Sequence, residues 1–501
     1  MRKIYLFTFM MLLLVHLKGQ AQQITLHVER AGTLPGMIDE SRLPYITDLK
    51  LTGELNGTDI KFIRTLTQEN LRFLDLSEAQ IVEGGNPYTI SSSVQITSSV
   101  HYYTRNNIIG VLMFCIEDRR KPSVISKIIL PKSTLEIQFR AFSGCTNLTN
   151  IDIPNSVTSI GTETFSDCTS LTDINIPNSV TSIESGTFYN CTSLTDINIP
   201  NSVTSIESGT FNSCTSLTDI NIPNSVTSIG SQAFYNCTSL TDINIPNLVT
   251  SIGSQAFSGC TSLTDINIPN LVTSIEDQTF YCCTSLTDIN IPNSVKSIGS
   301  ETFYRCTSLT DINIPNSVTS IEYGTFNYCT SLTDINIPNS VKSIGSWAFN
   351  GCTSLTDINI PDAVTSIGSK AFSGCTSLTN INIPNSVTNI GSKAFYDCDN
   401  LRSVYMNAST PPSIGDQAFH KSSKDLTIYI PRGSYSAYWI SYWGNYNLVE
   451  YDPTDIQGVT TSAHNGAEKY FSIDGRPLPG PCKGVNIIQD TDGKTRKAWI
   501  P

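Results

Sequence analysis

Cysteine recurs at a fixed interval of 23 residues through the middle of this chain. Eleven nearly identical units fill residues 145–397, and the unit at 237–259 reads CTSLTDINIPNLVTSIGSQAFSG. Self-similarity at such a period is typical of solenoids, in which each unit forms one coil and buries its apolar side against its neighbours. For this part of the chain, the repeat excludes a conventional globular domain.

Within each unit, the apolar residues alternate as in a short strand with one buried face. In the unit above, Leu240, Ile243 and Ile245 follow this period of two. A second extended piece is predicted over 249–252, followed by a short helical or 3-10 turn that places Phe257 in the core. We therefore expect an α/β-type but mostly β solenoid, right-handed and curved, with about 13 to 15 coils of 23 residues and a cap at each end.

The pattern Leu-x-x-Ile-x-Ile-Pro, followed by Val-x-x-Ile-Gly-x-x-Ala-Phe-x-x-Cys, resembles the unit of the BspA-like leucine-rich-repeat family. The resemblance covers more than half of the chain with little deviation. It implies a leucine-rich-repeat solenoid of the kind found in surface or secreted proteins, many of them from Bacteroidetes or mucosal protozoa. It also implies adhesion to host matrix, to cells or to other microbes.

The N-terminus has the features of a secretory signal peptide, predicted over 1–21. Arg2 and Lys3 precede an apolar run over 4–15, and small residues at Gly19 and Ala21 offer a cleavage site. The apolar run is shorter than the roughly 20 residues that span a bilayer, and no later segment is long enough either. We expect an extracellular protein without a membrane span, either secreted or displayed on the outer surface.

Irregular segments flank the array, which is predicted over 122–424. Residues 22–121 form an N-terminal cap of irregular leucine-rich coils, and its insertion at 83–107 is rich in Ser, Thr and Tyr. The insertion ends in His101, Tyr102 and Tyr103, which belong either to a solvated hairpin of the cap or to a loop that contacts a partner.

Two different segments follow the array. Residues 425–454 are rich in aromatic residues and are interpreted as a cap over the open core, with sugar binding as the alternative. Residues 455–501 form a tail that is similar to the C-terminal sorting segments of Bacteroidetes proteins exported by the type IX route. The tail is shorter than such segments and lacks their basic end, which puts surface display by that route in doubt.

Fifteen cysteines in an exported protein raise the question of disulfides. Twelve of them occupy one position of the repeat, beside apolar columns, where cysteine acts as a small hydrophobic residue. Bridging every pair of neighbouring coils would distort an even stack, so the sequence favours buried thiols. Zinc binding is disfavoured because no Cys-x-x-Cys spacing occurs and there are only five histidines.

Polar side chains alternate with the buried residues of the main strand and form two rows at identical register. The aspartate row comprises Asp173, Asp196, Asp219, Asp242, Asp265, Asp288, Asp311, Asp334 and Asp357. The asparagine row comprises Asn175, Asn198, Asn221, Asn244, Asn267, Asn290, Asn313, Asn336 and Asn359. These rows are the candidate binding face, with a plain solvated surface or weak Ca²⁺ binding as alternatives. Catalysis is disfavoured because paired carboxylates need unlike environments to act as acid and base.

The sequence shows no nucleophile elbow and no phosphate-cradling loop, so neither an enzyme nor a cofactor is predicted. A net charge of −12 disfavours nucleic acid as a partner. The favoured function is the binding of an extracellular protein or glycan, whose weak contacts add up along a repetitive face. The alternatives are a structural spacer that holds the terminal regions away from the cell and, more distantly, a polysaccharide-acting enzyme.

Overall fold

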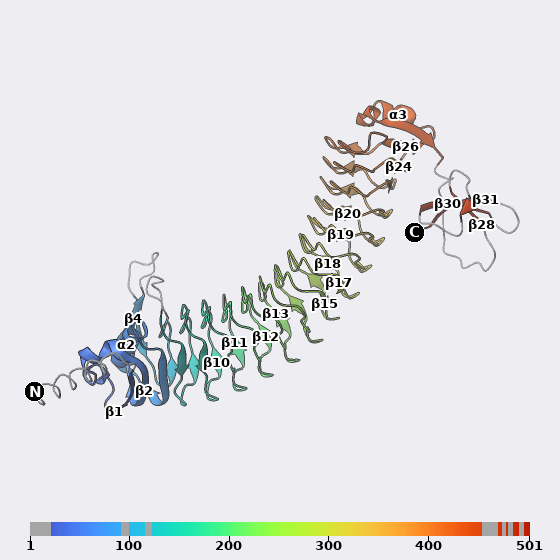
Figure 1. Cartoon of the computed structure of the whole chain (residues 1–501). Helices are drawn as coiled ribbons and strands as arrows, with labels where there is room; N and C mark the ends of the chain where they lie inside the picture. The colour runs from blue at the N-terminus through green and yellow to red at the C-terminus, as the bar shows by residue number, and fades with distance from the viewer. Residues whose placement is uncertain are drawn as a thin grey trace, which may run out of the picture.

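The computed structural model describes residues 22–91, 100–115 and 123–452, together with four short strands of the C-terminal tail. The predicted signal peptide at 1–21 lies outside the described residues. The coils stack into a long curved rod (Figure 1) of about 18 turns. The mostly β solenoid is therefore confirmed, but 13 to 15 coils was an underestimate. Strands near each end add coils without carrying the repeat motif.

On one side of the rod, the described coils other than the one at 237–259 contribute a strand, or a single bridge, to parallel pairing between neighbours. The strands on this side are β1 (Gln22–Val28), β2 (Ile46–Leu55), β3 (Phe73–Ile81), β7 (Lys127–Ile129), β9 (Asn150–Asp152), β15 (Asp265–Asn267), β17 (Asp288–Asn290), β22 (Asn380–Ile383), β24 (Ser403–Met406), β26 (Thr427–Pro431) and β27 (Asn447–Tyr451). In the coils between them, single bridges such as Asn175–Asn198 and Asn313–Asn336 maintain the same pairing. We refer to this side as the main ladder.

A second parallel ladder is built from two-residue strands, as predicted for the extended piece that follows valine in each unit. Its strands are β6 (Ile108–Ile109), β8 (Glu136–Ile137), β10 (Ser159–Ile160), β11 (Ser182–Ile183), β12 (Ser205–Ile206), β13 (Ser228–Ile229), β14 (Ser251–Ile252), β16 (Ser274–Ile275), β18 (Ser297–Ile298), β19 (Ser320–Ile321), β20 (Ser343–Ile344), β21 (Ser366–Ile367), β23 (Asn389–Ile390) and β25 (Ser413–Ile414). Serine pairs with serine and isoleucine with isoleucine in successive coils. The isoleucines that end these strands are buried in the core, except for Ile414, which is half-buried.

The third side of the coil consists of turns, not the short helix or 3-10 turn expected from the sequence. In the coil at 230–236, Gln232 and Asn236 adopt left-handed backbone conformations with φ of 57° and 55°. Their amides, and that of Phe234, donate hydrogen bonds of 2.7–3.0 Å to carbonyl oxygens of the next coil. The turns are thus also linked along the rod, which satisfies backbone groups that would otherwise be unpaired.

The core is a set of columns, each made of one residue type repeated from coil to coil. Phenylalanine rings from Phe114 to Phe419 stack with centroids 5.0–5.7 Å apart and planes within 12° of each other. In the repeated units these rings have no exposed surface. Each coil therefore depends on both neighbours to cover its apolar side, as a solenoid requires.

The repeated cysteines are buried free thiols in the described chain. Each sulfur donates to a phenylalanine carbonyl oxygen of the preceding coil, as Cys260 does to Phe234 over 3.2 Å. Burial raises the pKa of the Cys260 thiol to about 12, so the nucleophilic thiolate is suppressed. Cys282 differs from the others because its side chain is only half-buried. Cys482 lies outside the described residues.

This difference predicts selective thiol chemistry. In a Cys482→Ser background, iodoacetamide at pH 8 is expected to modify Cys282 while the repeated cysteines react only after unfolding, because their thiols are buried and protonated. Peptide mass spectrometry over time measures the rates. Adding Cys282→Ser should abolish the early modification, and early labelling of Cys260 would contradict the buried-thiol interpretation.

The N-terminal cap covers the first coils with helix α2 (Gly57–Thr67), 3-10 helices η1 (Leu34–Gly36) and η2 (Glu40–Tyr45), and the hairpin of β4 (Gly84–Ser91) and β5 (Val100–Thr104). Asp59 is fully buried in α2. Its carboxylate accepts hydrogen bonds from the amides of Leu34 and Asn56, each over 3.0 Å. These bonds tie α2 to the preceding turn and pair carboxyl oxygens that would be costly to bury without partners.

The C-terminal cap consists of β26, helix α3 (Tyr435–Trp439), 3-10 helix η3 (Tyr442–Asn445) and β27. In the tail, β28 (Lys469–Ser472), β29 (Pro477–Leu478), β30 (Gly484–Gln489) and β31 (Thr495–Ile500) form an antiparallel sheet in the order β29-β28-β30-β31. Across the described segments, the structure contains no helix of the length and hydropathy needed to cross a bilayer.

Candidate functional site

The aspartate and asparagine rows lie on the outer surface of the main ladder. In β15, the isoleucine between Asp265 and Asn267 is buried, whereas both polar side chains are exposed. The next strand repeats this arrangement, with Asp288 opposite Asp265 and Asn290 opposite Asn267. Eight of the nine aspartates are exposed and Asp357 is half-buried. We call these two rows the aspartate–asparagine face.

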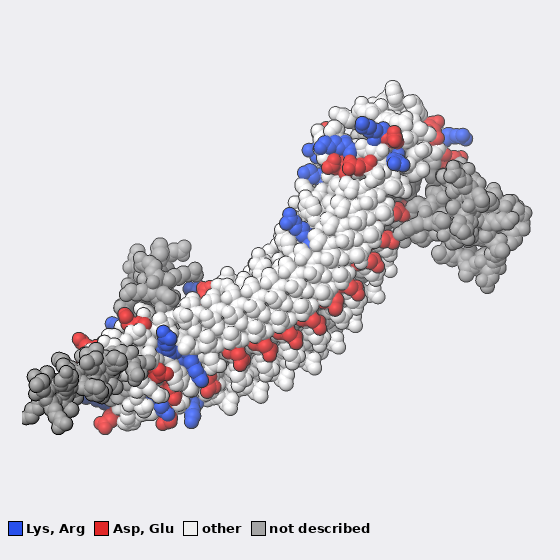
Figure 2. All heavy atoms as spheres, viewed as in Figure 1, with Lys and Arg blue, Asp and Glu red and all other residues white. Residues whose placement is uncertain are grey.

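Hydrogen bonds along the rod hold this face in register. The Asn290 amide nitrogen donates to the Asn267 side-chain oxygen over 2.9 Å. Beside the rows, threonine hydroxyls donate to the threonine carbonyl of the preceding coil, as Thr287 does to Thr264 over 3.1 Å. Figure 2 shows acidic side chains in a file along the rod, with lysine and arginine grouped toward its two ends. Adjacent carboxylates therefore recur at the coil rise of about 5 Å.

This arrangement offers many equivalent contacts and no reactive centre that differs from its neighbours. Acid–base catalysis by two carboxylates depends on environments that separate their pKa values, and each coil repeats the same residues around its aspartate. Within the ranges that the structure describes, no group of three or more His, Cys, Asp and Glu side chains is arranged to hold a metal ion. The face presents repeated groups for multivalent hydrogen bonding and charge pairing.

Sequence comparison matches residues 121–241, 227–356 and 343–444 to the BspA type leucine rich repeat region. The chain belongs to this family. A leucine-rich repeat protein from Bacteroides ovatus is 30% identical, with a TM-score of 0.52, over 64% of this chain and 93% of its own. A leucine rich cell surface protein from Faecalibacterium prausnitzii is 32% identical, over 60% of this chain and 86% of its own, with a TM-score of 0.42. No curated protein matches this chain.

Membership in the BspA-type family confirms the resemblance predicted from the repeat, and the match ends at residue 444. The similarity of the tail to sorting segments therefore stays a prediction. The family's repeats form solenoids with extended surfaces, a fold that suits a binding or a structural role. The chain is accordingly a leucine-rich-repeat protein of the BspA type.

The insertion residues of this BspA-type chain lie in β5, which pairs with β4 in the N-terminal hairpin. Side chains alternate along the strand, so Tyr102 packs against the core while His101 and Tyr103 are exposed, Tyr103 to 53%. The three residues thus do not form one site. The hairpin belongs to the N-terminal cap, whereas the aspartate–asparagine face begins in the repeated coils.

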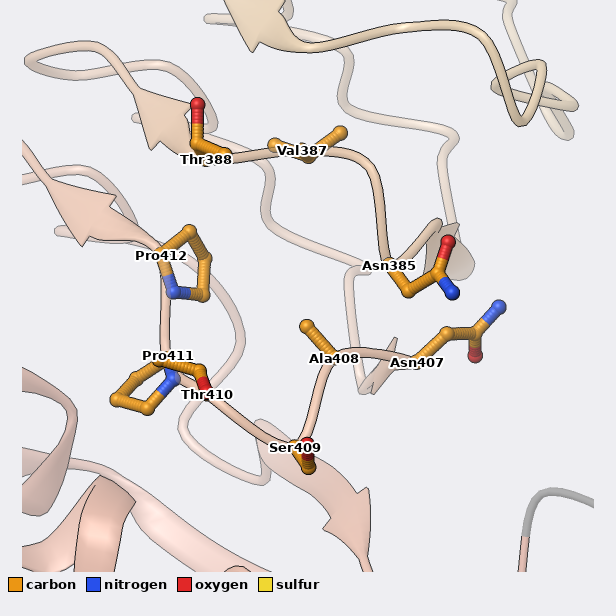
Figure 3. Close-up of a pocket in the computed structure, with 9 residues that line it drawn as sticks. All are labelled: Asn385, Val387, Thr388, Asn407, Ala408, Ser409, Thr410, Pro411 and Pro412. Atoms are coloured by element: carbon orange, nitrogen blue, oxygen red, sulfur yellow. The ribbon is translucent and has the colours of Figure 1, made fainter.

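A pocket near the C-terminal end of the array was not predicted from the sequence. A hollow of about 500 Å³ lies between 385–388 and the loop 407–412 (Figure 3). The loop arises because the coil after Cys398 is longer than 23 residues. Pro411 and Pro412 line one wall, and no charged side chain lines the pocket. Its shape is a consequence of the irregular coil that joins the array to the cap.

Proposed function

We propose that this protein is a non-enzymatic binding protein, secreted or displayed at the bacterial surface, which holds an extended extracellular protein or glycan on its aspartate–asparagine face. The observation that carries the proposal is the register of nine aspartates at one position of successive coils. A partner with regularly spaced hydrogen-bond donors or cationic groups can contact many coils at once. Each exposed charge pair contributes only about 0.2–1 kcal/mol, so affinity comes from their number.

Charge-neutral substitutions on the face test this proposal. A partner is first selected by probing glycan and matrix-protein arrays with the mature chain, with and without Ca²⁺. Changing Asp219, Asp242 and Asp265 together to asparagine is then expected to raise the Kd for that partner about tenfold, because three weak ion pairs are lost. Titration by biolayer interferometry measures the change.

A matched variant removes the same charge elsewhere. It carries Glu184→Gln, Glu276→Gln and Glu322→Gln. These glutamates lie at the start of the turns, away from the aspartate–asparagine face. We expect this triple variant to bind within about twofold of the parent protein, because charges outside an interface contribute little to affinity. Equal weakening by both triple variants would contradict binding through the face and indicate a general effect of net charge.

A deletion that shortens the rod distinguishes a spacer role from binding along the repeats. Deleting 214–282 removes three whole coils, so the flanking units keep their register. Binding along the repeats predicts a gradual loss of affinity, because fewer coils contact the partner. Unchanged affinity in a folded deletion variant would place the contacts in the caps and favour a spacer.

A further inference from the structure

Differences between the coils are concentrated on the turns. The strand sequence TSLTDINIP is identical in the nine units that start at Cys168 and end with the unit of Cys352. The turns differ, as in SETFYR at 300–305 and SWAFNG at 346–351. Stacking fixes the core positions in every coil, so the coils differ mainly at surface positions, and most of these lie on the turns. The turns are therefore the surface that offers the most coil-specific side chains to a partner bound at a fixed place along the rod.

The turns in the second half of the array bring aromatic rings and cations together. The rings of Tyr281 and Tyr304 stack with centroids 4.5 Å apart. Arg305 lies over the rings of Tyr304 and Tyr328, at 5.5 and 5.7 Å from their centroids. These residues come from three successive coils, so the cluster runs along the rod. Tyr328 is 40% exposed, which leaves part of its surface available.

Further along, the same combination recurs. The Lys370 ammonium group lies 3.9 Å from the ring centroid of Trp347, which belongs to the preceding coil. Lys393 and Lys421 lie 5.4 and 5.3 Å from the ring centroid of Tyr396. Cation–π contacts hold these flexible side chains near the rings. We call Tyr304, Arg305, Tyr328, Trp347, Lys370 and Lys393 the turn strip.

The local charge of the turn strip differs from that of the turns nearer the N-terminus. Two carboxylates in its turns already accept hydrogen bonds: Glu301 from the Gln278 amide over 2.6 Å, and Glu322 from the Ser320 hydroxyl over 2.5 Å. A third carboxylate, Asp397, lies in the turn of Lys393. The corresponding turns of the earlier coils carry mainly acidic residues: Glu163, Asp167, Glu184 and Glu207. Salt screens interactions between charges that are more than about 8 Å apart. A ligand on the turn strip therefore interacts mainly with the charged side chains of the strip and the carboxylates beside it, and little with the acidic turns nearer the N-terminus.

We propose that the turn strip binds an acidic polysaccharide. Sugar rings pack on the exposed parts of the tyrosine and tryptophan rings, and carboxylate or sulfate groups pair with the cations. The arginine fork suits a planar carboxylate or a sulfate in particular. A nucleic acid is less well matched, because its affinity depends on many phosphate contacts and the strip has three cations. This site is separate from the aspartate–asparagine face.

The test uses two pairs of polymers, and the two members of each pair differ chiefly in charge. The full mature chain is titrated with dextran sulfate and with unmodified dextran, and with polygalacturonate and its methyl ester. We expect binding to one or both acidic polymers and none to their neutral counterparts. The triple variant Arg305→Gln, Lys370→Gln and Lys393→Gln should raise the Kd about tenfold, from the loss of three exposed ion pairs. Trp347→Ala should also weaken binding, since it removes a ring surface.

A matched triple variant, Lys132→Gln, Lys296→Gln and Lys342→Gln, removes the same charge at exposed positions outside the turns. It is expected to leave the Kd within about twofold of the parent value. The proposal is overturned if neither acidic polymer binds, if the neutral polymers bind equally well, or if the two triple variants weaken binding equally. The aspartate triple variant of the main ladder should not weaken this binding, which separates failure of this site from failure of the aspartate–asparagine face.

Discussion

Replacing Phe257 by alanine is expected to lower the free energy of unfolding by about 3–5 kcal/mol, the usual cost of removing a fully buried aromatic side chain. Its ring has no exposed surface and lies between those of Phe234 and Phe280, with centroids 5.4 and 5.7 Å away. The register of the main ladder and of the turns prevents the flanking coils from closing the gap. Denaturant titration followed by circular dichroism measures the loss.

Hydrogen exchange shows where the stability is lost. Each coil contacts only its neighbours, so exchange should accelerate most in the coils around 234–280 and least near the ends of the rod. Tyr323→Ala is the matched control, because that ring is 46% exposed and its removal should cost within about 0.5 kcal/mol. Uniform acceleration along the whole rod would contradict the nearest-neighbour picture and indicate one cooperative unit.

The polar rows of the main ladder were predictable from the sequence because the period of a strand is fixed. Once Ile266 is placed in the core, Asp265 and Asn267 have to point outward, and the 23-residue repeat sets their register with the next coil. The 23-residue repeat also placed the phenylalanines and the repeated cysteines in columns, because residues one period apart meet in successive coils. The partner of these rows could not be predicted from the repeat. Coils with the same strand residues show where the polar side chains lie but not which molecule they contact.

The turns were predicted less well, for a conformational reason. The sequence favours a helical turn before Phe234, but Gln232 and Asn236 adopt left-handed conformations that non-glycine residues seldom adopt. Hydrogen bonds between coils stabilise these conformations. Such bonds exist only in the stack, so no local sequence signal shows them. The clusters of Tyr304 and Trp347 with cations were missed for the same reason, because their members lie a whole coil apart.

The coil count was too low because the outermost strands lack the repeat motif. Strand β1 pairs with β2 over seven residues, but only Ile24 and Val28 are buried in it. Strand β27 pairs with β26, and none of its five residues is buried. Each strand lies at an end of the ladder and has only one neighbouring strand. Few of its residues are buried, so the burial that produces a hydrophobic period in the sequence of a strand is largely missing. The C-terminal segment 425–454 thus contributes coils as well as the aromatic cap over the core.

Trp443→Ala is expected to destabilise the C-terminal end of the rod by about 3–5 kcal/mol. The indole is fully buried against Phe419, the last ring of the column, and its nitrogen donates to the Pro412 carbonyl oxygen over 2.9 Å. Its loss uncovers the open core and leaves that carbonyl unpaired. Thermal unfolding and light scattering should show a lower Tm and earlier aggregation. Trp439→Ala, four residues earlier and 57% exposed, should change neither; equal effects of the two variants would show that the buried indole does not close the stack.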